Sequence, residues 1–206
     1  MTKGRFITVE GGEGVGKSTN IEFLCQLIRQ RSLRVLDTRE PGGTPMAEQI
    51  RSMLLSHGTE PLPAIAELLL FFAARSLHVN NVIVPAIESG SWVVCDRFTD
   101  TTRAYQGCGR GLGRDRIETL AHWVHPQLIP DLTVLLDAPL DVGRDRSERR
   151  GEADRLEAEQ LAFHKRVREG YLALAEAEPG RFAVIDASRP LPAVQQQIER
   201  AMHALF

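Results

Sequence analysis

A glycine-rich segment near the start of the chain has the residue types and spacing needed to hold a polyphosphate. Residues 11–18 match the pattern G-x-x-x-x-G-K-[ST]. Its glycines let backbone N–H groups turn inward around phosphate oxygens, Lys17 can reach the β- and γ-phosphates, and Ser18 can offer its hydroxyl to magnesium. We predict that this segment binds a nucleoside triphosphate whose terminal phosphoryl group is then transferred. The predicted binding residues are Gly11, Gly12, Glu13, Gly14, Val15, Gly16, Lys17, Ser18 and Thr19.

The segment lies between a predicted strand and a predicted helix, as this motif requires. Residues 6–9 form a short apolar run, and apolar residues recur at helical spacing from residue 21 to residue 28. A helix that begins at the end of the loop adds the partial positive charge of its dipole to a phosphate site. A glycine-rich turn that binds nothing would not need both flanking elements, so we favour phosphate binding.

Charged residues also follow the next two predicted strands, at the sheet edge where open α/β sheets bind ligands. The second strand leads into residues 39–44, whose glycines would allow a ligand to approach the backbone closely. The third strand is followed by Asp96 and Arg97. A carboxylate beside a guanidinium suits a water-mediated magnesium contact and a bidentate phosphate clamp. The alternative is a local ion pair at the end of the strand.

Two pairs of residues at helical spacing could recognise a nucleobase. Phe71 and Arg75 are four positions apart and share one helix face, so a ring and a guanidinium could stack on a base and hydrogen-bond to it. Thr102 and Gln106 repeat the spacing and add polar groups. The alternative for Phe71 is ordinary core packing. The expected core face of its helix consists of Ile65, Leu68, Leu69 and Phe72.

Arginines alternate with acidic residues from Arg144 to Arg155, and Gly151 offers a point at which the segment could bend. Mobile arginines that close over a triphosphate would neutralise charge in the transition state and exclude water. The alternative is a solvated helix with intrahelical ion pairs. We expect a mobile lid at about residues 144–157.

Strands and helices alternate along the whole chain, which predicts an α/β fold with a parallel sheet covered on both faces. Thr44 and Pro45 should cap a helix to Leu55, and Asp115 with Glu118 resembles a capping box. Apolar residues of the closing helix share one face: Leu191, Val194, Ile198 and Leu205. The predicted strands cover 6–9, 34–38, 92–95, 132–136 and 182–185; helices cover 64–78 and 79–89, and a long polar helical region covers 139–177.

The composition is that of one globular domain covering residues 1–206, with 43% hydrophobic residues and a formal net charge of -2. Such a charge argues against a general binder of nucleic acid or membrane surfaces. Cys25, Cys95 and Cys108 lack metal-ligand spacing and are expected to be reduced, buried thiols. We expect neither a signal peptide before the first strand nor an apolar run of transmembrane length, and therefore a cytoplasmic protein.

Together these segments resemble the thymidylate kinase family, over nearly the whole chain. The resemblance rests on six segments: 10–19, 38–44, 71–75, 96–98, 104–107 and 151–157. It implies a P-loop nucleoside monophosphate kinase fold with a five-stranded parallel sheet flanked by helices. It also implies ATP-dependent phosphorylation of thymidine monophosphate (dTMP) to the diphosphate, with Mg²⁺, and usually a homodimer.

The resemblance also implies roles for individual residues. Arg51 and Arg97 would hold the acceptor phosphate, and Phe71 would stack on thymine. Glu13 would lie near the sugar 3′-hydroxyl. Because Gly14 and Val15 stand where some members have an arginine, the catalytic arginine should come from the lid, as in bacterial-type members. The remaining implied residues are Arg75, Thr102 and Gln106 at the edge of the base, Asp96 and Glu157 near magnesium, and Arg146 and Arg150 as lid arginines.

Two other classes of protein compete with this interpretation. The first is another nucleotide or deoxynucleoside kinase with a different base preference, which a panel of acceptors would separate. The second is a nucleotide-dependent switch, but the Asn-Lys-x-Asp guanine motif of GTPases does not occur in the sequence. A switch would also not need the residues assigned to an acceptor.

Overall fold

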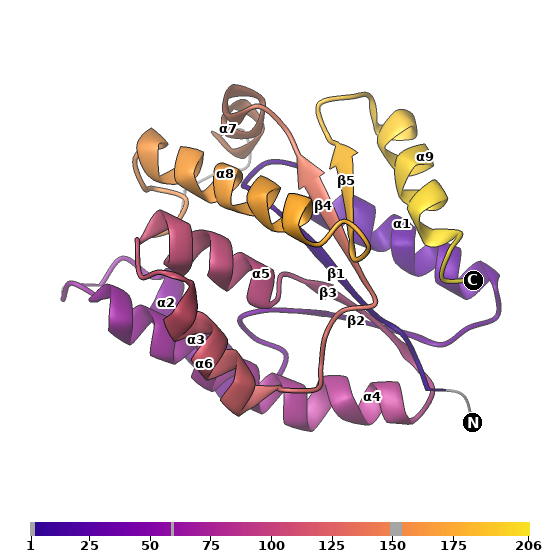
Figure 1. Cartoon of the computed structure of the whole chain (residues 1–206), viewed down its shortest axis with the longest axis horizontal. Helices are drawn as coiled ribbons and strands as arrows, with labels where there is room; N and C mark the ends of the chain where they lie inside the picture. The colour runs from indigo at the N-terminus through magenta and orange to yellow at the C-terminus, as the bar shows by residue number, and fades with distance from the viewer. Residues whose placement is uncertain (1–2, 59, 149–153) are drawn as a thin grey trace.

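A five-stranded parallel sheet forms the centre of the structure (Figure 1). The computed structural model describes residues 3–58, 60–148 and 154–206. The predicted α/β fold and its five strands are confirmed. β1 is buried at every residue, as expected for a central parallel strand covered on both faces. The strands in spatial order are β2 (Val35–Arg39), β3 (Trp92–Asp96), β1 (Phe6–Gly11), β4 (Leu132–Asp137) and β5 (Phe182–Asp186).

Two helices, α1 (Lys17–Gln30) and α9 (Leu191–Met202), lie together and cover one face of the sheet (Figure 1). Ile7 and Val9 of β1 point into this layer, where Val194 and Ile198 of α9 pack. The predicted face of the closing helix is thus confirmed at Val194 and Ile198, and Leu205, beyond the end of α9, also packs against this layer. Leu191 is exposed instead, because it lies in the first turn beyond the edge of the layer.

The other face of the sheet carries the remaining helical layers. Phe6 packs there with η1 (Val79–Ile83), a π-helical segment, and Leu135 of β4 packs against α8 (Leu161–Ala177). The helices α2, α3 and α6 form a group at one side of the molecule (Figure 1). The other helices of the described chain are α2 (Pro45–Leu55), α3 (Ala64–His78), α4 (Val84–Glu88), α5 (Thr99–Thr102), η2 (Arg103–Gly109, π-helical), α6 (Arg114–Val124) and α7 (Leu140–Glu148).

The segment Ala64–Glu88 corrects the expectation that no apolar run reaches transmembrane length. Its 25 residues are long and apolar enough by length and composition to cross a membrane. In the fold, 44% of its most apolar window is buried, and α3 packs between α2 and α6. A core helix can have the same length and apolar composition as a membrane-spanning one, and we interpret this segment as part of the protein core.

The start of α6 and the polar region 139–177 differ from their predictions, whereas the start of α2 does not. Asp115 is not a cap, since α6 begins at Arg114 after Gly113, and Glu118 instead accepts hydrogen bonds from Arg103. In the described part of the polar region 139–177, α7 and α8 are separate helices, and a turn at residues 155–158 precedes α8. The Thr44 cap is confirmed, because its hydroxyl accepts from the N–H of Ala47 at 3.2 Å.

The predicted core face of α3 is also only half correct. Leu68 and Phe72 are buried, but Ile65 and Leu69 are 45% and 52% exposed. The buried face instead includes charged groups, because Glu67, Arg75 and His78 find partners within the fold. Cys25 and Cys95 are buried as expected, whereas Cys108 is exposed; all three are free thiols.

The buried face of α9 generates a stability prediction. Ile198→Ala should lower the free energy of unfolding by about 2 to 5 kcal/mol, because it leaves a cavity against the sheet. Leu191→Ala, in the same helix but exposed, should change it by less than about 0.5 kcal/mol. Urea unfolding of both variants measures the difference. Equal losses would contradict the assignment of Ile198 to the core.

Candidate active site

The glycine-rich segment forms a loop between β1 and α1, as predicted. Gly16 directly precedes α1 and has φ +88°, in the left-handed region that favours glycine. A Cβ on Gly14 would lie 1.9 Å from the carbonyl oxygen of Gly143 in α7. The loop therefore needs glycine both for its turn and for the close approach of the neighbouring helix.

Lys17 lies against the loop that it follows. Its Nζ donates to the carbonyl oxygen of Gly12 at 2.7 Å and to that of Gly11 at 3.4 Å. Burial lowers the pKa of Lys17, and the nearby charge of Arg97 lowers it further. An anionic oxygen at this position would favour the charged ammonium group, so the loop is suited to a phosphate.

One cavity of about 540 Å³ joins the phosphate-binding loop to the ends of β2 and β3. This arrangement follows from the parallel register, which pairs Val9 with Asp96 and so places the strand ends at one edge. Gly11, Gly12 and Val15 line a second cavity instead. The predicted site residues that line the first cavity are Glu13, Gly14, Gly16, Lys17, Ser18, Thr19, Arg51, Phe71, Asp96, Arg97, Arg146 and Glu157.

Arg97 connects the two sides of this cavity. Its backbone has φ +68°, in the left-handed region, and its Nη1 donates to the carbonyl oxygen of Gly11 at 3.0 Å. Its Nη2 lies 2.5 Å from Glu13, which also accepts from the hydroxyl of Tyr105 at 2.9 Å. Arg97 thus pairs with Glu13 of the loop and not with its neighbour Asp96.

Glu13 is held as a carboxylate by these contacts. Burial acts to raise the pKa of Glu13, but the charges of Arg97 and Lys17 outweigh burial and hold the pKa well below its ordinary value. An ionised Glu13 can only accept hydrogen bonds, so it can receive one from a substrate hydroxyl as well as from Arg97.

Arg51 reaches the same cavity from α2. Its Nη1 donates to the carbonyl oxygen of Pro41 at 2.9 Å, which fixes the guanidinium beside the end of β2. The adjacent glycines are needed within the fold itself, and the approach of a ligand to them stays a prediction. A Cβ on Gly43 would lie 2.3 Å from the ring of His78, and one on Gly42 would lie 2.4 Å from Glu48.

The structure divides the four residues expected at a nucleobase. Phe71 is buried in the core, as its alternative predicted, and it also lines the cavity, whereas Arg75, Thr102 and Gln106 are buried and do not line it. Arg75 donates through Nε to Glu40 at 2.7 Å and through Nη2 to the hydroxyl of Thr102 at 3.0 Å. The four residues are brought together as a group, and their contact with a base stays a prediction.

The group expected near magnesium contains an acceptor without a partner. Oδ1 of Asp96 is buried and accepts no hydrogen bond from the residues that the structure describes. Ser18 and Glu157 line the same cavity. Across the described residues, no cluster of three or more His, Cys, Asp or Glu side chains could hold a metal. This sparse donor set fits Mg²⁺, which takes one or two carboxylates and completes its shell with water and substrate phosphates.

The expected lid is described at both of its ends, on α7 and from Asp154 onward. Arg146 donates through Nη1 to the carbonyl oxygen of Ala187 at 3.0 Å and lines the cavity. Arg150, the other predicted lid arginine, lies outside the described residues. After the gap, Arg155 donates through Nε to the carbonyl oxygen of Leu54 at 2.8 Å, which ties this end to α2.

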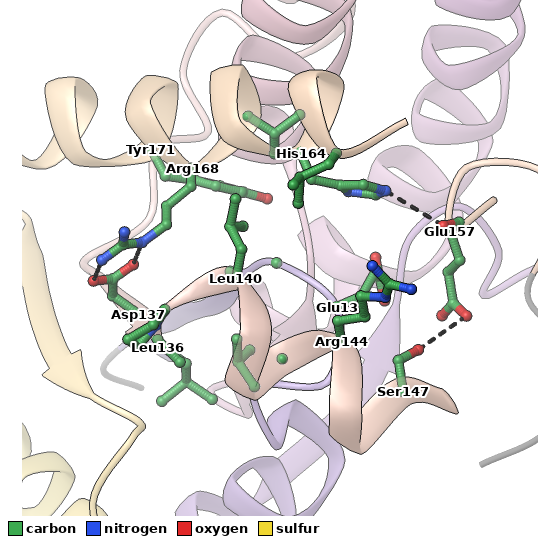
Figure 2. A pocket seen from close by; sticks show the side chains of 18 of the residues that line it. Glu13, Leu136, Asp137, Leu140, Arg144, Ser147, Glu157, His164, Arg168 and Tyr171 are labelled. Carbon is green, nitrogen blue, oxygen red and sulfur yellow. Dashed lines mark hydrogen bonds and ion pairs between the residues drawn. The ribbon is translucent and has the colours of Figure 1, made fainter. Parts of the chain in front are cut away.

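A second cavity of about 420 Å³ lies between α7 and α8, beside the loop (Figure 2). Asp137, at the end of β4, accepts two hydrogen bonds from Arg168 of α8 at 2.7 and 2.8 Å. The hydroxyl of Ser147 donates to Glu157 at 3.3 Å, and Nε2 of His164 donates to the carbonyl oxygen of Glu157 at 3.3 Å. Glu13 and Glu157 line both cavities.

Glu10 is a buried carboxylate that the sequence analysis did not assign to the site. It accepts from the N–H of Phe98 at 2.8 Å, from the hydroxyl of Thr101 at 2.5 Å and from the hydroxyl of Tyr171 at 3.1 Å. Burial and the nearby charge of Asp100 raise the pKa of Glu10 to about 7. Its place at the end of β1, directly before the glycines, was the signal available in the sequence.

These features define a class of protein: a P-loop phosphotransferase whose triphosphate loop faces arginines at neighbouring strand ends. Similarity to known proteins identifies the family within this class. The model of the family described as thymidylate kinase matches residues 9–198. The chain belongs to the thymidylate kinase family and is a kinase.

Relatives of this chain cover it almost completely. Thymidylate kinase of Methylococcus capsulatus is 56% identical over 206 residues, covering 100% of this chain and 98% of that protein. Thymidylate kinase of Chromohalobacter salexigens is 59% identical over 200 residues, covering 96% and 94%. The crystal structure of thymidylate kinase from Ehrlichia chaffeensis superposes with a TM-score of 0.80 at 30% identity, covering 98% of this chain and 100% of that one.

The raised pKa of Glu10 predicts a dependence of stability on pH. The unfolded chain loses this proton near pH 4.5 and the folded chain near 7, so the folded state should lose stability as the pH rises between these values. Glu10→Gln removes the titration and keeps an oxygen for Phe98. Its free energy of unfolding relative to the unmodified protein should rise from pH 4.5 to 8, by at most about 3 kcal/mol. A pH-independent difference in urea unfolding would contradict the shift.

Proposed function

We propose that this chain transfers the γ-phosphoryl group of ATP to dTMP, giving ADP and thymidine diphosphate. A phosphate oxygen of dTMP forms the new bond to the γ-phosphorus while the bond to the β,γ-bridging oxygen breaks. One observation carries the proposal: Lys17 and the phosphate-binding loop share a cavity with Arg51 and Arg97. Cationic groups on both sides offset the repulsion between two phosphate anions.

The donor and acceptor sides have separate tasks. Lys17 and the loop N–H groups hold the triphosphate, and Arg51 with Arg97 holds the acceptor phosphate. Glu13 accepts from the sugar 3′-hydroxyl. Phosphoryl transfer needs little covalent help, so we assign no obligatory protein base.

The base of dTMP occupies the region around Phe71, which stacks on the ring. The described contacts support this placement, because Phe71 lines the cavity and Arg75 lies on the same face of α3. Arg75, Thr102 and Gln106 hydrogen-bond to the edge of the base. Their burial within the fold makes them a fixed set of donors and acceptors.

Mg²⁺ is held by the hydroxyl of Ser18, with Asp96 and Glu157 in its surroundings. The buried, unpartnered Oδ1 of Asp96 supports this assignment. Bound there, the ion supplies positive charge next to the β- and γ-phosphates. The chain acts as a single domain with a mobile lid at about residues 144–157, from which Arg146 and Arg150 reach the transferring group.

The enzyme works in the cytoplasm as a homodimer. Its free thiols suit a reducing compartment. For the dimer interface we assign the α3 patch, defined as Ile65, Leu69 and Trp123. Trp123 is 74% exposed on α6, which packs against α3. A helix with apolar residues on two faces, such as α3, is suited to burial on both faces. The fold buries one face, and a second copy of the chain buries the exposed face.

Loss of the Lys17 ammonium group tests the proposed function. Lys17→Ala should lower kcat for ADP formation from ATP and dTMP by roughly a thousandfold, because a preorganised charge at the transferring group is lost. A coupled assay of diphosphate formation measures this loss, and circular dichroism checks that the fold is retained. Turnover equal to that of the unmodified protein would refute the assignment, and uridine and cytidine monophosphates in the same assay test the acceptor.

The α3 patch generates a test of the assembly. Leu69→Glu should convert a dimer into a monomer in sedimentation velocity, because a buried charge without a partner is costly in an interface. Val184→Glu adds the same charge at an exposed position of β5 and should leave the dimer intact. A Leu69→Glu protein that stays dimeric would place the interface elsewhere.

A further inference from the structure

Glu67 of α3 collects donors from three separate segments, although its side chain is fully buried. Gln106 donates through Nε2 to its Oε1 at 2.7 Å. Arg110 donates to both of its oxygens at 3.2 Å. Nη2 of Arg155, from the far end of the expected lid, lies 2.7 Å from Oε2. None of these contacts was anticipated from the sequence.

These donors keep Glu67 ionised. Burial acts to raise the pKa of Glu67, but hydrogen bonds from Arg110, Gln106 and Arg155 outweigh burial and hold the pKa below its ordinary value. An ionised carboxylate only accepts hydrogen bonds, whereas an amide has one accepting and one donating end. Glu67 therefore admits only the nitrogen of Gln106, and the orientation of this amide is fixed by chemistry.

The fixed amide leaves its oxygen available on the other side. Oε1 of Gln106 is buried and has no hydrogen-bond partner among the described residues, and Nη1 of Arg75 is in the same state. Thr102 accepts from Nη2 of Arg75 and precedes Gln106 by four residues in the sequence. Arg75 follows Phe71 by one helical turn of α3, and Glu67, the partner of Gln106, precedes Phe71 by one turn. Buried polar atoms are seldom left unpaired, so this acceptor and this donor indicate a ligand that pairs with both.

We propose that Glu67 is a positioning residue that makes the site select pyrimidines with an N3–H and a 4-oxo group over cytosine. The Oε1 of Gln106 accepts from N3–H, and Nη1 of Arg75 donates to O4. Cytosine presents an acceptor at N3 and a donor at C4, so it would leave both protein atoms facing like groups. This inference rests on the proposed function, because it assumes that the base lies beside Phe71.

Substitution of Glu67 by glutamine should reverse the selection. Arg155 and Arg110 both bind Oε2 of Glu67, so the single oxygen of the introduced amide would stay with these two arginines. The nitrogen of the introduced amide would then face Gln106 and Nε of Arg110, which would lose its weaker contact at 3.2 Å. The Gln106 amide would turn to present its oxygen to that nitrogen, and its own nitrogen would point toward the base.

The experiment measures kcat/KM for dTMP and for deoxycytidine monophosphate with Glu67→Gln. The ratio of the two values should fall by about tenfold or more, chiefly through KM, because the reacting phosphate is not altered. Glu67→Asp keeps an acceptor-only group and should retain a ratio within about threefold of the unmodified protein. Glu118→Gln is the matched control, since Glu118 binds Arg103 of the same segment η2 without contacting Gln106. It should leave the ratio unchanged.

Equal losses for both substrates in Glu67→Gln would overturn the proposal, because a merely structural role lowers both values together. The dTMP activity of the unmodified protein tests the proposed function separately. If Glu67→Gln does not fold, a crystal structure of the unmodified protein with dTMP decides the question. The Gln106 oxygen within hydrogen-bond distance of N3 supports the proposal; an amide nitrogen there, or a base that contacts neither Gln106 nor Arg75, overturns it.

Discussion

The ion pair between Arg97 and Glu13 fixes the geometry on which the whole site depends. Arg97 follows β3 and Glu13 follows β1, so their contact joins two neighbouring strand ends across the phosphate-binding loop. The left-handed backbone at Arg97 turns its guanidinium toward the loop, where the carbonyl oxygen of Gly11 also binds it. A side chain in a sparsely populated backbone conformation persists only where its surroundings hold it. Here the parallel register, Glu13 and the carbonyl oxygen of Gly11 together determine where the guanidinium of Arg97 lies relative to the phosphate-binding loop.

The features that were predictable from the sequence are those encoded by local spacing. The loop of Lys17 is set by glycines at fixed offsets, and the parallel strands by short apolar runs between helices. Features set by distant partners were missed. In the sequence, Glu10 is an ordinary strand end and Glu67 an ordinary helix position. Their partners lie 88 to 161 residues away from Glu10 and 39 to 88 residues away from Glu67, and only the fold brings them together. The error at Leu69 has the same origin, since charged residues with partners occupied the face that spacing assigned to apolar ones.

Carboxylates position several of the arginines in and around the site, whereas backbone carbonyl oxygens hold Arg51 and Arg146. Arg97 is paired with Glu13, Arg75 with Glu40, and Arg110 and Arg155 with Glu67. Burying such pairs is weak support for stability, because desolvation opposes the attraction between the charges. Their contribution is to order the arginine side chains before a ligand binds. A guanidinium that is already held in place loses little conformational freedom when an anion binds. The lining of the cavity contains five basic and five acidic side chains, so Lys17 and its arginines act as local positive groups among carboxylates.

The contacts of Arg155 tie the residues after the expected lid to two helices of the site. Arg155 is bound to Leu54 of α2 and to Glu67 of α3, so the end of the expected lid is anchored on the two helices that also carry Arg51 and Phe71. At its other end, Arg146 is bound to Ala187, on the loop after β5. The side chain of Arg155 thus connects α2 to α3 through one hydrogen bond and one ion pair. A shift of either helix would change the position of Arg155 directly, because both contacts are made by the same guanidinium group. Arg51 and Phe71 lie on these two helices, so the contacts of Arg155 help to set the distance between them.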